Sequence, residues 1–511
     1  MAENSVNPRL SSRPLTARKL GWNSRMIVVL ASVIVACIAA LELRVSGLSI
    51  EEMSIEDTPV TVYRLPGLDP APPVVMAHGF AGSRQMMDQI AVSLARSGFL
   101  VASVDLPGHG RNTVQLSPDI TRIEGTTQQL VEVVDQVAEA VATRPDTAGP
   151  VSYVGHSMAT DVAIRASQLR DDVGGVVAIS MYSPAVTESD PAALLVLSGA
   201  TEGHLRAAGL EAVRLIDPEA VEGDTVTGDG VTRRTAVAPF VGHVGVLYAP
   251  QSLDETTRWL RETVGTGAPA PLDHSGWIKG VLFVSLVLLV WPLSRLLPEL
   301  SLAPKTAISW RGFLACLLAP VPVVVLIALL PAFGVAGHAS FGTLGAIFAA
   351  WGLVQLAILR RLGLGFDRPD ALGLCVYLAL ALLFALALDR YGAAFVPTGA
   401  RTVVLLGLLI GTVPLMLADT MLVQGASILR RVLAQFVLLA GLAAAMAFSP
   451  SDLGLAFTTL PVLLLFFLVF GTMARWVAAR RGLSCVALGK GLVLAWAVAA
   501  STPLFAVAGL P

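Results

Sequence analysis

Charged residues are scarce in this chain: they make up 14% of its 511 residues, whereas hydrophobic residues make up 54%. Soluble domains usually carry about a quarter charged residues, so much of the chain must lie outside water. The formal net charge of −2 and the lack of any long basic run argue against a nucleic-acid partner. Only four cysteines occur, and none lies between residues 50 and 275, which excludes a disulfide framework there. The Cys and His spacing of zinc sites is also absent, and the sequence implies no metal or organic cofactor.

Composition divides the chain into four parts. Residues 1–25 are polar and basic, 26–47 contain an apolar run long enough to span a bilayer, 48–275 have the composition of a water-soluble domain, and 276–511 are almost continuously apolar. The last part contains eight predicted spans, near 277–297, 311–333, 340–360, 370–389, 402–424, 431–448, 454–475 and 485–508. No domain of this size could bury so many apolar runs of roughly 20 residues, so we expect a multi-pass membrane protein.

The positions of the basic residues predict an orientation in the cell membrane. The N-terminal tail is basic and should be cytoplasmic, which places residues 48–275 on the outer side and, after nine spans, the C-terminus outside as well. Later loops rich in Arg or Lys fall on the cytoplasmic side, except the loop with Arg390 and Arg401. A lipoprotein cleavage site ending at Cys37 is an alternative for the first span, but the apolar run continues past it and favours an uncleaved anchor.

Residues 48–275 alternate short apolar segments with segments of helical periodicity. This alternation predicts an α/β layer structure, and the short apolar strands favour a mostly parallel sheet covered on both faces. Strands are predicted at 59–65, 74–77, 99–104, 151–154, 176–180 and 194–197, and helices near 83–97, 126–143, 159–170 and 253–263.

Three motifs stand at the ends of predicted strands: His78-Gly79-Phe80, Asp105-Leu106-Pro107-Gly108-His109-Gly110 and Gly155-His156-Ser157-Met158-Ala159. In these motifs and their order the segment, about 220 residues long, resembles the α/β-hydrolases. The resemblance implies that Ser157 is a nucleophile on a sharp turn between a strand and a helix, although the family usually has Gly where this chain has Ala159. It also implies an oxyanion hole made of the backbone N–H groups of Phe80 and Met158.

A serine nucleophile needs a base, and the family order is serine, acid, histidine. Three histidines follow Ser157 within the soluble part: His204, His243 and His274. His274 lies beside the membrane, and His204 stands where the acid is expected. His243 occupies a late loop before a predicted helix, the position that the family uses for its base, and it is our candidate.

The acid of the family commonly follows the strand predicted here at 194–197. Glu202 lies a few residues after that strand and is our candidate, with three aspartates as rivals: Asp190, Asp217 and Asp224. In a plainer interpretation Ser157 is only a helix cap, and the histidine and the glutamate are solvated surface groups.

Many α/β-hydrolases carry a lid after the strand that ends here near Ser180, but only a short segment separates Ser180 from Leu194. We therefore expect an active site that is open to water or covered by the membrane surface or the helical region. This arrangement favours a lipid or another acyl-containing substrate.

Two ionisable residues interrupt the later apolar runs, Asp419 in the sixth span overall and Lys490 in the ninth. Charges within a membrane are costly and usually paired or functional. In the predicted topology both lie near the cytoplasmic ends of their spans, far from Ser157. We expect them to pair or to share a polar pocket.

The sequence thus predicts a membrane-bound serine hydrolase, esterase- or lipase-like, that cleaves an ester or other acyl bond. An acyltransferase with the same triad, in which a membrane-held alcohol or amine replaces water, is one alternative. A transporter or receptor with an inactive hydrolase-like domain is another. No oligomeric state is specified by the sequence.

Overall fold

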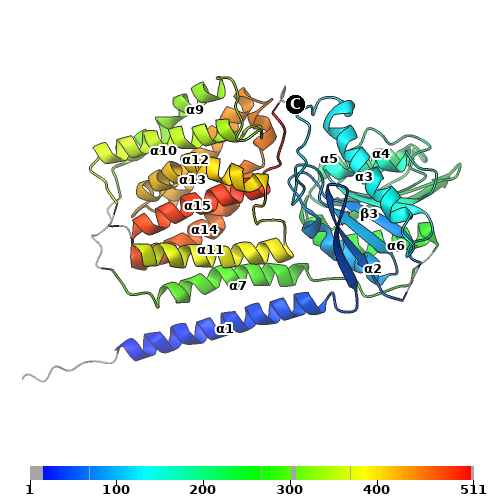
Figure 1. Ribbon diagram of the computed structural model, residues 1–511, viewed down its shortest axis with the longest axis horizontal. Coiled ribbons are helices and arrows are strands. Elements are labelled where there is room, and N and C mark those ends of the chain that lie inside the picture. The colour runs from blue at the N-terminus through cyan, green and yellow to red at the C-terminus, as the bar shows by residue number, and fades with distance from the viewer. Residues whose placement is uncertain are drawn as a thin grey trace, which may run out of the picture.

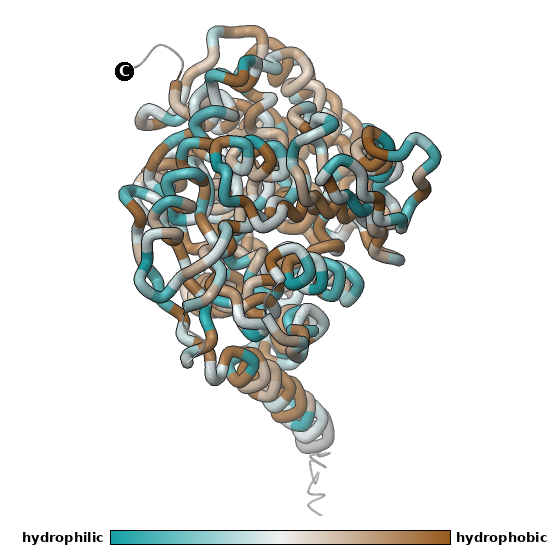
Figure 2. The backbone as a smooth tube through the Cα atoms, turned by 90° about the vertical axis from the view of Figure 1, so that its right-hand side faces the viewer, coloured by the Kyte–Doolittle hydropathy of each residue, from teal (hydrophilic) through white to brown (hydrophobic). Residues whose placement is uncertain are grey.

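The structure has two parts, a sheet domain and a bundle of apolar helices, which lie side by side in Figure 1. It is a computed structural model that describes residues 15–67, 70–265, 267–300, 307–366, 368 and 370–507. Figure 2 views the sheet domain end-on: many of its loops and helices are hydrophilic, and the N-terminal helix α1 (Leu15–Leu43) runs away beneath it. The predicted fold class, an α/β domain joined to a multi-span helical region, is confirmed.

Within the described residues the sheet has nine strands, in the order β1-β2-β4-β3-β5-β6-β7-β9-β8. They are β1 (Ser49–Ile55), β2 (Thr58–Arg64), β3 (Pro73–Ala77), β4 (Leu100–Val104), β5 (Val151–His156), β6 (Val173–Ile179), β7 (Ala193–Gly199), β8 (Thr225–Gly228) and β9 (Val231–Ala238). The central strands pair in parallel, whereas β1, β2 and β8 make antiparallel pairs toward the edges. Every residue of β3, β4 and β5 is buried, as expected for a parallel sheet covered on both faces.

Helices cover both faces of this sheet. Residues of α2 (Asp88–Arg96) and α6 (Pro250–Val264) join the apolar core on one face, and residues of α3 (Gln128–Ala142), α4 (Met158–Ser167) and α5 (Gly203–Arg214) join it on the other. The buried residues of α3 recur every three or four positions, which is the spacing of a helix with one apolar face. Short helical turns occur at η1 (Arg84–Met87), η2 (Ile123–Thr127) and η3 (Gly245–Tyr248).

Three of the strands lack the apolar pattern that predicted the others. β1 and β8 lie at the sheet edges, and β1 carries exposed Glu51 and Glu52. β9 contains Arg233, which is fully buried and donates hydrogen bonds to the carbonyls of Ala212 (2.8 Å) and Asp190 (3.3 Å). Since these partners come from distant segments, the sequence pattern could not reveal β9.

Nine helical stretches of the described residues are long and apolar enough to cross a membrane. After α1 the helices are α7 (Gly276–Ser294), α8 (Trp310–Leu318), α9 (Pro320–Ala328), α10 (Phe341–Arg361), α11 (Ala371–Tyr391), α12 (Ala400–Leu422), α13 (Ile428–Phe448), η4 (Leu453–Ala456), α14 (Thr459–Arg481) and α15 (Leu483–Ser501). Of these, α8 with α9 and η4 with α14 each count as one stretch. Helix α1 lies at the outer edge of the bundle beside α7, as Figure 1 shows.

The predicted span 311–333 is corrected by the structure. It is divided between α8 and α9, and its last helix ends at Ala328. Pro320 begins α9, where its missing N–H removes a hydrogen bond that a continuous helix would need.

The predicted end of the last span is also wrong, because α15 ends at Ser501. Residues 502–507 instead run along the sheet domain, and residue 508 lies outside the described residues. The N–H of Leu116 donates to the carbonyl of Leu504 (2.8 Å), and the N–H of Ala506 donates to the carbonyl of Leu116 (2.9 Å). The C-terminal segment therefore ties the helical bundle to the loop that follows β4.

A buried group of charges joins the chain on both sides of the sheet domain. Arg44, just after α1, donates to the carboxylates of Asp88 and Asp273. Lys279, near the start of α7, donates to the second oxygen of Asp88 at 2.6 Å. The segments that enter and leave the domain thus share one carboxylate, on α2.

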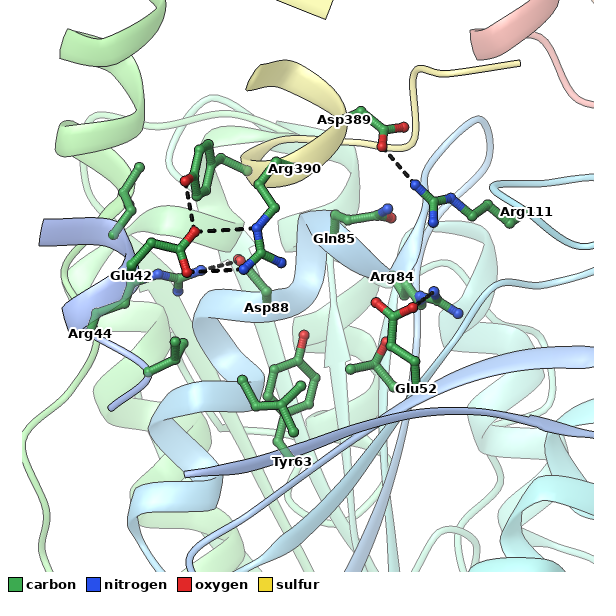
Figure 3. A pocket seen from close by; sticks show the side chains of 15 residues that line it. Glu42, Arg44, Glu52, Tyr63, Arg84, Gln85, Asp88, Arg111, Asp389 and Arg390 are labelled. Carbon is green, nitrogen blue, oxygen red and sulfur yellow. Dashed lines mark hydrogen bonds and ion pairs between the residues drawn. The ribbon is translucent and has the colours of Figure 1, made fainter. Parts of the chain in front are cut away.

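The loop with Arg390 and Arg401, which departs from the predicted pattern of basic cytoplasmic loops, has a structural explanation. Arg390 forms an ion pair with Glu42 of α1 (3.0 Å), beside a polar cavity of about 250 Å³ that Figure 3 shows. Arg401 is buried and donates to the carbonyls of Gly108 (2.7 Å) and Thr502 (2.8 Å). Both arginines therefore hold parts of the protein together, rather than lying free on a membrane face.

Replacing Asp88 with Asn should lower the free energy of unfolding by about 3 kcal/mol at neutral pH, because Arg44 and Lys279 would remain buried without their common counter-ion. Burial acts to raise the pKa of Asp88, but Lys279 and Arg44 hold it below its ordinary value. The carboxylate therefore stabilises the fold fully above about pH 4, and its contribution is lost as the pH falls through the lowered pKa.

Melting temperatures of the purified protein in detergent measure this effect: the gap between wild type and Asp88→Asn should shrink in acid. Asp254→Asn removes a mostly exposed carboxylate and serves as control. Equal melting temperatures of wild type and Asp88→Asn at neutral pH would contradict the prediction.

Candidate active site

Ser157 stands on a sharp turn between β5 and α4. Its backbone has a φ of 53° and a ψ of −119°, which a residue with a side chain adopts only under constraint. The turn is held by hydrogen bonds from the Ser157 N–H to the carbonyl of Ile179 (2.8 Å) and from the Thr160 N–H to the carbonyl of Ser157 (2.9 Å). A Cβ atom on Gly155 would lie 2.2 Å from the carbonyl oxygen of Ala159, so only glycine fits there.

The structure brings Ser157, His243 and Glu202 into one line of hydrogen bonds. Nε2 of His243 lies 2.8 Å from Oγ of Ser157, and Nδ1 lies 2.6 Å from Oε1 of Glu202. An ionised carboxylate only accepts hydrogen bonds, so Nδ1 must carry a proton and Nε2 must present its lone pair to the serine hydroxyl. The three side chains are therefore arranged for transfer of the hydroxyl proton to the imidazole.

Glu202 is almost buried, with 6% of its side chain exposed. Its second oxygen accepts hydrogen bonds from the Gly199 N–H (2.6 Å) and the Ser180 hydroxyl (2.8 Å). Burial acts to raise the pKa of Glu202, but the hydrogen bonds from His243, Gly199 and Ser180 lower it below the ordinary value. The carboxylate is thus kept ionised and fixed in orientation beside the imidazole.

The loop after β3 passes directly against the serine turn. A Cβ atom on Gly79 would lie 2.9 Å from Cβ of Ser157, which explains the glycine before Phe80. Within the described residues the Phe80 N–H donates no hydrogen bond. Met158 is the first residue of α4, where a helix leaves its N–H groups without partners in the helix. Two backbone donors thus remain available beside Ser157.

Residues 69–218 match a family model described as serine aminopeptidase, S33. This match agrees with the parallel sheet and with the strand, turn and helix around Ser157. The sheet domain has the α/β-hydrolase fold. The matched segment contains Ser157 and Glu202 and ends before His243, which is supplied by the part of the α/β-hydrolase domain that follows β9.

No curated protein matches the chain. Similar solved structures include a dienelactone hydrolase from Anabaena variabilis, with 18% identity, a TM-score of 0.34 and coverage of 43% of this chain and 100% of that chain. An esterase from Pyrobaculum calidifontis has 15% identity, a TM-score of 0.33 and coverage of 47% and 92%. A membrane phospholipase A, described as a novel bacterial virulence factor, has 14% identity, a TM-score of 0.31 and coverage of 46% and 92%. Identities this low say nothing about the substrate of the α/β-hydrolase domain.

The rival acids lie elsewhere in the domain, and each accepts hydrogen bonds from its own loop. Asp190 accepts from the hydroxyl of Ser189, Asp217 from the N–H of Glu219 and Asp224 from the N–H of Val221. His204 lies on α5, and its side chain has no hydrogen bond to Ser157. Of the described histidines, His243 is the one that the structure places on the serine hydroxyl.

His156 has a role that the sequence did not reveal. Its Nε2 lies 2.8 Å from the backbone carbonyl of His243, so it holds the loop that carries the imidazole. Burial lowers its pKa to about 4, and the ring stays neutral at ordinary pH. The residue before the nucleophile in the motif was visible in the sequence, but its partner lies 87 positions away.

No lid covers the site from the segment between β6 and β7, which contains no helix within the described residues. The helical bundle instead reaches the α/β-hydrolase domain beside Phe80. The ring of Phe80 stacks on Phe457, with centroids 5.3 Å apart and planes at 7°, and lies 6.1 Å from the ring of Phe505. The side chain of His243 remains 47% exposed, so the site is covered on one side only.

Asp419 and Lys490 lie together inside the helical bundle. Nζ of Lys490 donates to Oδ2 of Asp419 and lies 3.2 Å from the hydroxyl of Thr420. Helix α12 supplies the acid and α15 the amine, near the ends of these helices that point away from the α/β-hydrolase domain. In the described part of the chain no group of three or more His, Cys, Asp or Glu residues could hold a metal ion.

Gly155→Ala should destabilise the domain by roughly 2 kcal/mol or more, because the added methyl group meets the backbone of α4 and the turn must move. Thermal melting of the purified protein measures the loss. Gly203→Ala is the matched control, since a Cβ there meets nothing within 4 Å. A Gly155→Ala protein that melts at the wild-type temperature would show that the turn is less tightly packed than described.

Proposed function

We propose that this chain is a membrane-bound serine hydrolase that cleaves an ester or related acyl bond. Ser157 is the nucleophile, His243 the general base and Glu202 the acid that orients the base. The observation that carries the proposal is the unbroken line of hydrogen bonds from Glu202 through both ring nitrogens of His243 to the hydroxyl of Ser157. Such a line is the arrangement that makes a serine hydroxyl nucleophilic.

The reaction has two halves. In the first, Oγ of Ser157 attacks the acyl carbonyl carbon and its proton passes to Nε2 of His243. The leaving group takes that proton as the tetrahedral intermediate collapses to an acyl-enzyme. In the second, water attacks the acyl-enzyme, gives its proton to His243, and the serine regains a proton as the acid product leaves.

Negative charge develops on the carbonyl oxygen in both halves. The N–H groups of Phe80 and Met158 are proposed to receive it, assisted by the N-terminus of α4, because donors fixed before the reaction need no reorganisation. Glu202 stabilises the imidazolium that forms on His243, and its lowered pKa keeps it ionised for that role.

We further propose that the nine apolar stretches cross the membrane, with the N-terminus cytoplasmic and the α/β-hydrolase domain outside. The loops that contact this domain support the placement. The loops 334–340 and 449–454 carry no Lys or Arg. The exceptional arginines in this set, Arg390 and Arg401, are bound to Glu42 and to backbone carbonyls. The loops at the opposite ends of the helices are rich in arginine, as cytoplasmic loops usually are.

A lipid or another acyl-containing molecule is the proposed substrate. Apolar side chains lie on segments near the serine turn: Phe457 of the helical bundle lies against Phe80, and Tyr182 and Phe240 are 73% and 98% exposed on segments next to α4 and His243. Exposed apolar side chains grouped around a site favour an apolar ligand or a membrane surface. Because Phe457 belongs to the helical bundle, these apolar side chains would lie close to the bilayer in the proposed orientation.

Labelling with a fluorophosphonate probe tests the proposed chemistry. Wild-type protein should be labelled, whereas Ser157→Ala should not, and His243→Ala should label and turn over esters about six orders of magnitude more slowly. Glu202→Gln should cause a smaller loss, because the imidazole keeps its place but loses its charge partner.

His204→Ala and Ser189→Ala are the matched controls, since both residues lie on the same domain away from Ser157. Absence of labelling in folded wild-type protein would contradict the proposal and favour a receptor or transporter. Product analysis with added alcohols or amines distinguishes hydrolysis from acyl transfer.

Phe457→Ala should lower kcat for a long-chain acyl ester by up to about tenfold, because the stack that supports Phe80 is worth about 1 kcal/mol. A change in kcat with little change in KM indicates that Phe457 positions the oxyanion loop. Phe448→Ala, an exposed phenylalanine at the end of α13, is the control.

Wild-type protein should also prefer long acyl esters, and equal turnover of short soluble esters would count against a lipid substrate.

A further inference from the structure

The helical bundle contains a second cavity, far from Ser157. It has a volume of about 400 Å³ and lies between the ends of α12, α13, α14 and α15 that point away from the α/β-hydrolase domain. Three cationic side chains line it, from three different helices: Arg431 of α13, Arg475 of α14 and Lys490 of α15. Among the described residues, none that lines it is acidic.

Two of the three cations have no carboxylate partner among the described residues. Lys490 is paired with Asp419, which accounts for one positive charge. In the described part of the chain neither Arg431 nor Arg475 has a carboxylate within ion-pair distance. The hydrogen bond of the Arg475 side chain goes to the hydroxyl of Thr472 on its own helix (2.6 Å). Two positive charges therefore remain at the cavity.

Arg431 also has an orphaned buried atom. Its Nε is shielded from solvent and has no hydrogen-bond partner among the described residues. Buried polar groups in folded proteins nearly always have partners, so an N–H without one indicates a ligand or water. Neighbouring arginines differ: Arg430 lies on the ring of Trp310, Arg480 pairs with Glu299 and Arg481 with Asp370.

We infer that this cavity binds the phosphate group of an anionic lipid. Two guanidinium groups without a counter-ion, beside the ammonium group of Lys490 that is paired with Asp419, are suited to recognise phosphate. The other walls favour a lipid over free phosphate. Trp476 and the apolar residues Val423, Leu483 and Val486 line the same cavity, where they would contact the glycerol region and the first part of an acyl chain.

The cavity is separate from the proposed reaction. It lies at the opposite ends of the helices from the segment that contacts Phe80, so a lipid bound there is not the substrate of Ser157 in the same position. Its occupancy requires the proposed membrane placement but no hydrolase activity. A lipid there would fill the space between α13, α14 and α15 and bring a negative charge to the two arginines.

The test uses the full-length protein in phosphatidylcholine nanodiscs, with and without phosphatidylglycerol. Native mass spectrometry measures the retained lipid, and thermal melting measures the stabilisation that a bound ligand gives. Phosphatidylglycerol should be retained and should raise the melting temperature. Arg431→Gln with Arg475→Gln should weaken its binding by at least about tenfold for each arginine.

Arg360→Gln with Arg361→Gln is the matched control. It removes the same charge from exposed arginines at the end of α10, which do not line the cavity. If the double cavity variant does not fold, Arg475→Gln alone and the charge-retaining Arg431→Lys with Arg475→Lys replace it. The single variant should lose about tenfold in affinity, and the lysine variant should keep most of the binding.

Three results would overturn the inference. Equal weakening in the Arg360 and Arg361 control would show a general surface effect of charge. Stabilisation by inorganic phosphate alone, with no added effect of phosphatidylglycerol, would assign the cavity to a soluble anion. Equal melting temperatures in both nanodiscs, with no retained phosphatidylglycerol, would show that the cavity has no anionic lipid. Fluorophosphonate labelling of the same variants reports on the proposed hydrolase separately.

Discussion

The hydrogen bonds of the buried Arg401 guanidinium are the interactions that most directly join the sheet domain to the helical bundle. It donates to the carbonyls of Gly108 and Gly110 in the loop after β4, and to those of Ala499, Ala500 and Thr502 at the end of α15. A charge buried in this way is tolerated only when its donors are satisfied, and the carbonyls supply that. The same loop contains Asp105, whose carboxylate accepts a hydrogen bond from the N–H of Arg84. Arg84 follows Phe80 closely in the chain. The helical bundle therefore helps to fix the loops around Ser157.

Because the helical bundle contacts the sheet domain, it can cover the region that a lid covers in other proteins of this fold. An α/β-hydrolase fold without an inserted lid would ordinarily have an open serine, but here Phe457 of the helical bundle and Phe505 of the C-terminal segment lie against Phe80. The side chains that cover Phe80 thus come from parts of the chain 300 or more positions beyond Ser157. The exposed ring of Phe240 would be unfavourable in water, but it is compatible with a position beside a bilayer.

Much of the sheet domain could be predicted because strand ends in a parallel sheet meet at one edge. The motifs at Phe80 and Ser157, and the loop positions of Glu202 and His243, follow from that geometry and from family order, and the structure brings these residues together. Strand β9 could not be predicted, because the buried Arg233 depends on carbonyls that only the folded chain supplies. The contact of His156 with the His243 carbonyl could not be predicted from the sequence for the same reason.

In the helical part, hydropathy located the stretches but not their ends. The predicted last span continued to residue 508, because hydropathy does not distinguish an apolar helix from an apolar non-helical segment that packs on another domain. Leu504 and Phe505 are apolar for the second reason. The predicted neighbourhood of Asp419 and Lys490 rested on depth alone, and their placement on facing helices required the packing of α12 against α15.

The shared carboxylate of Asp88 has a mechanical consequence. The chain enters the sheet domain beside Arg44 and leaves it beside Lys279, and both are bound to the same side chain. These two tethers converge on one point, and the C-terminal segment attaches the domain at a second place, through the hydrogen bonds of Leu504 and Ala506 with Leu116. The sheet domain that carries Ser157 is thus fastened to the helices at two separate places.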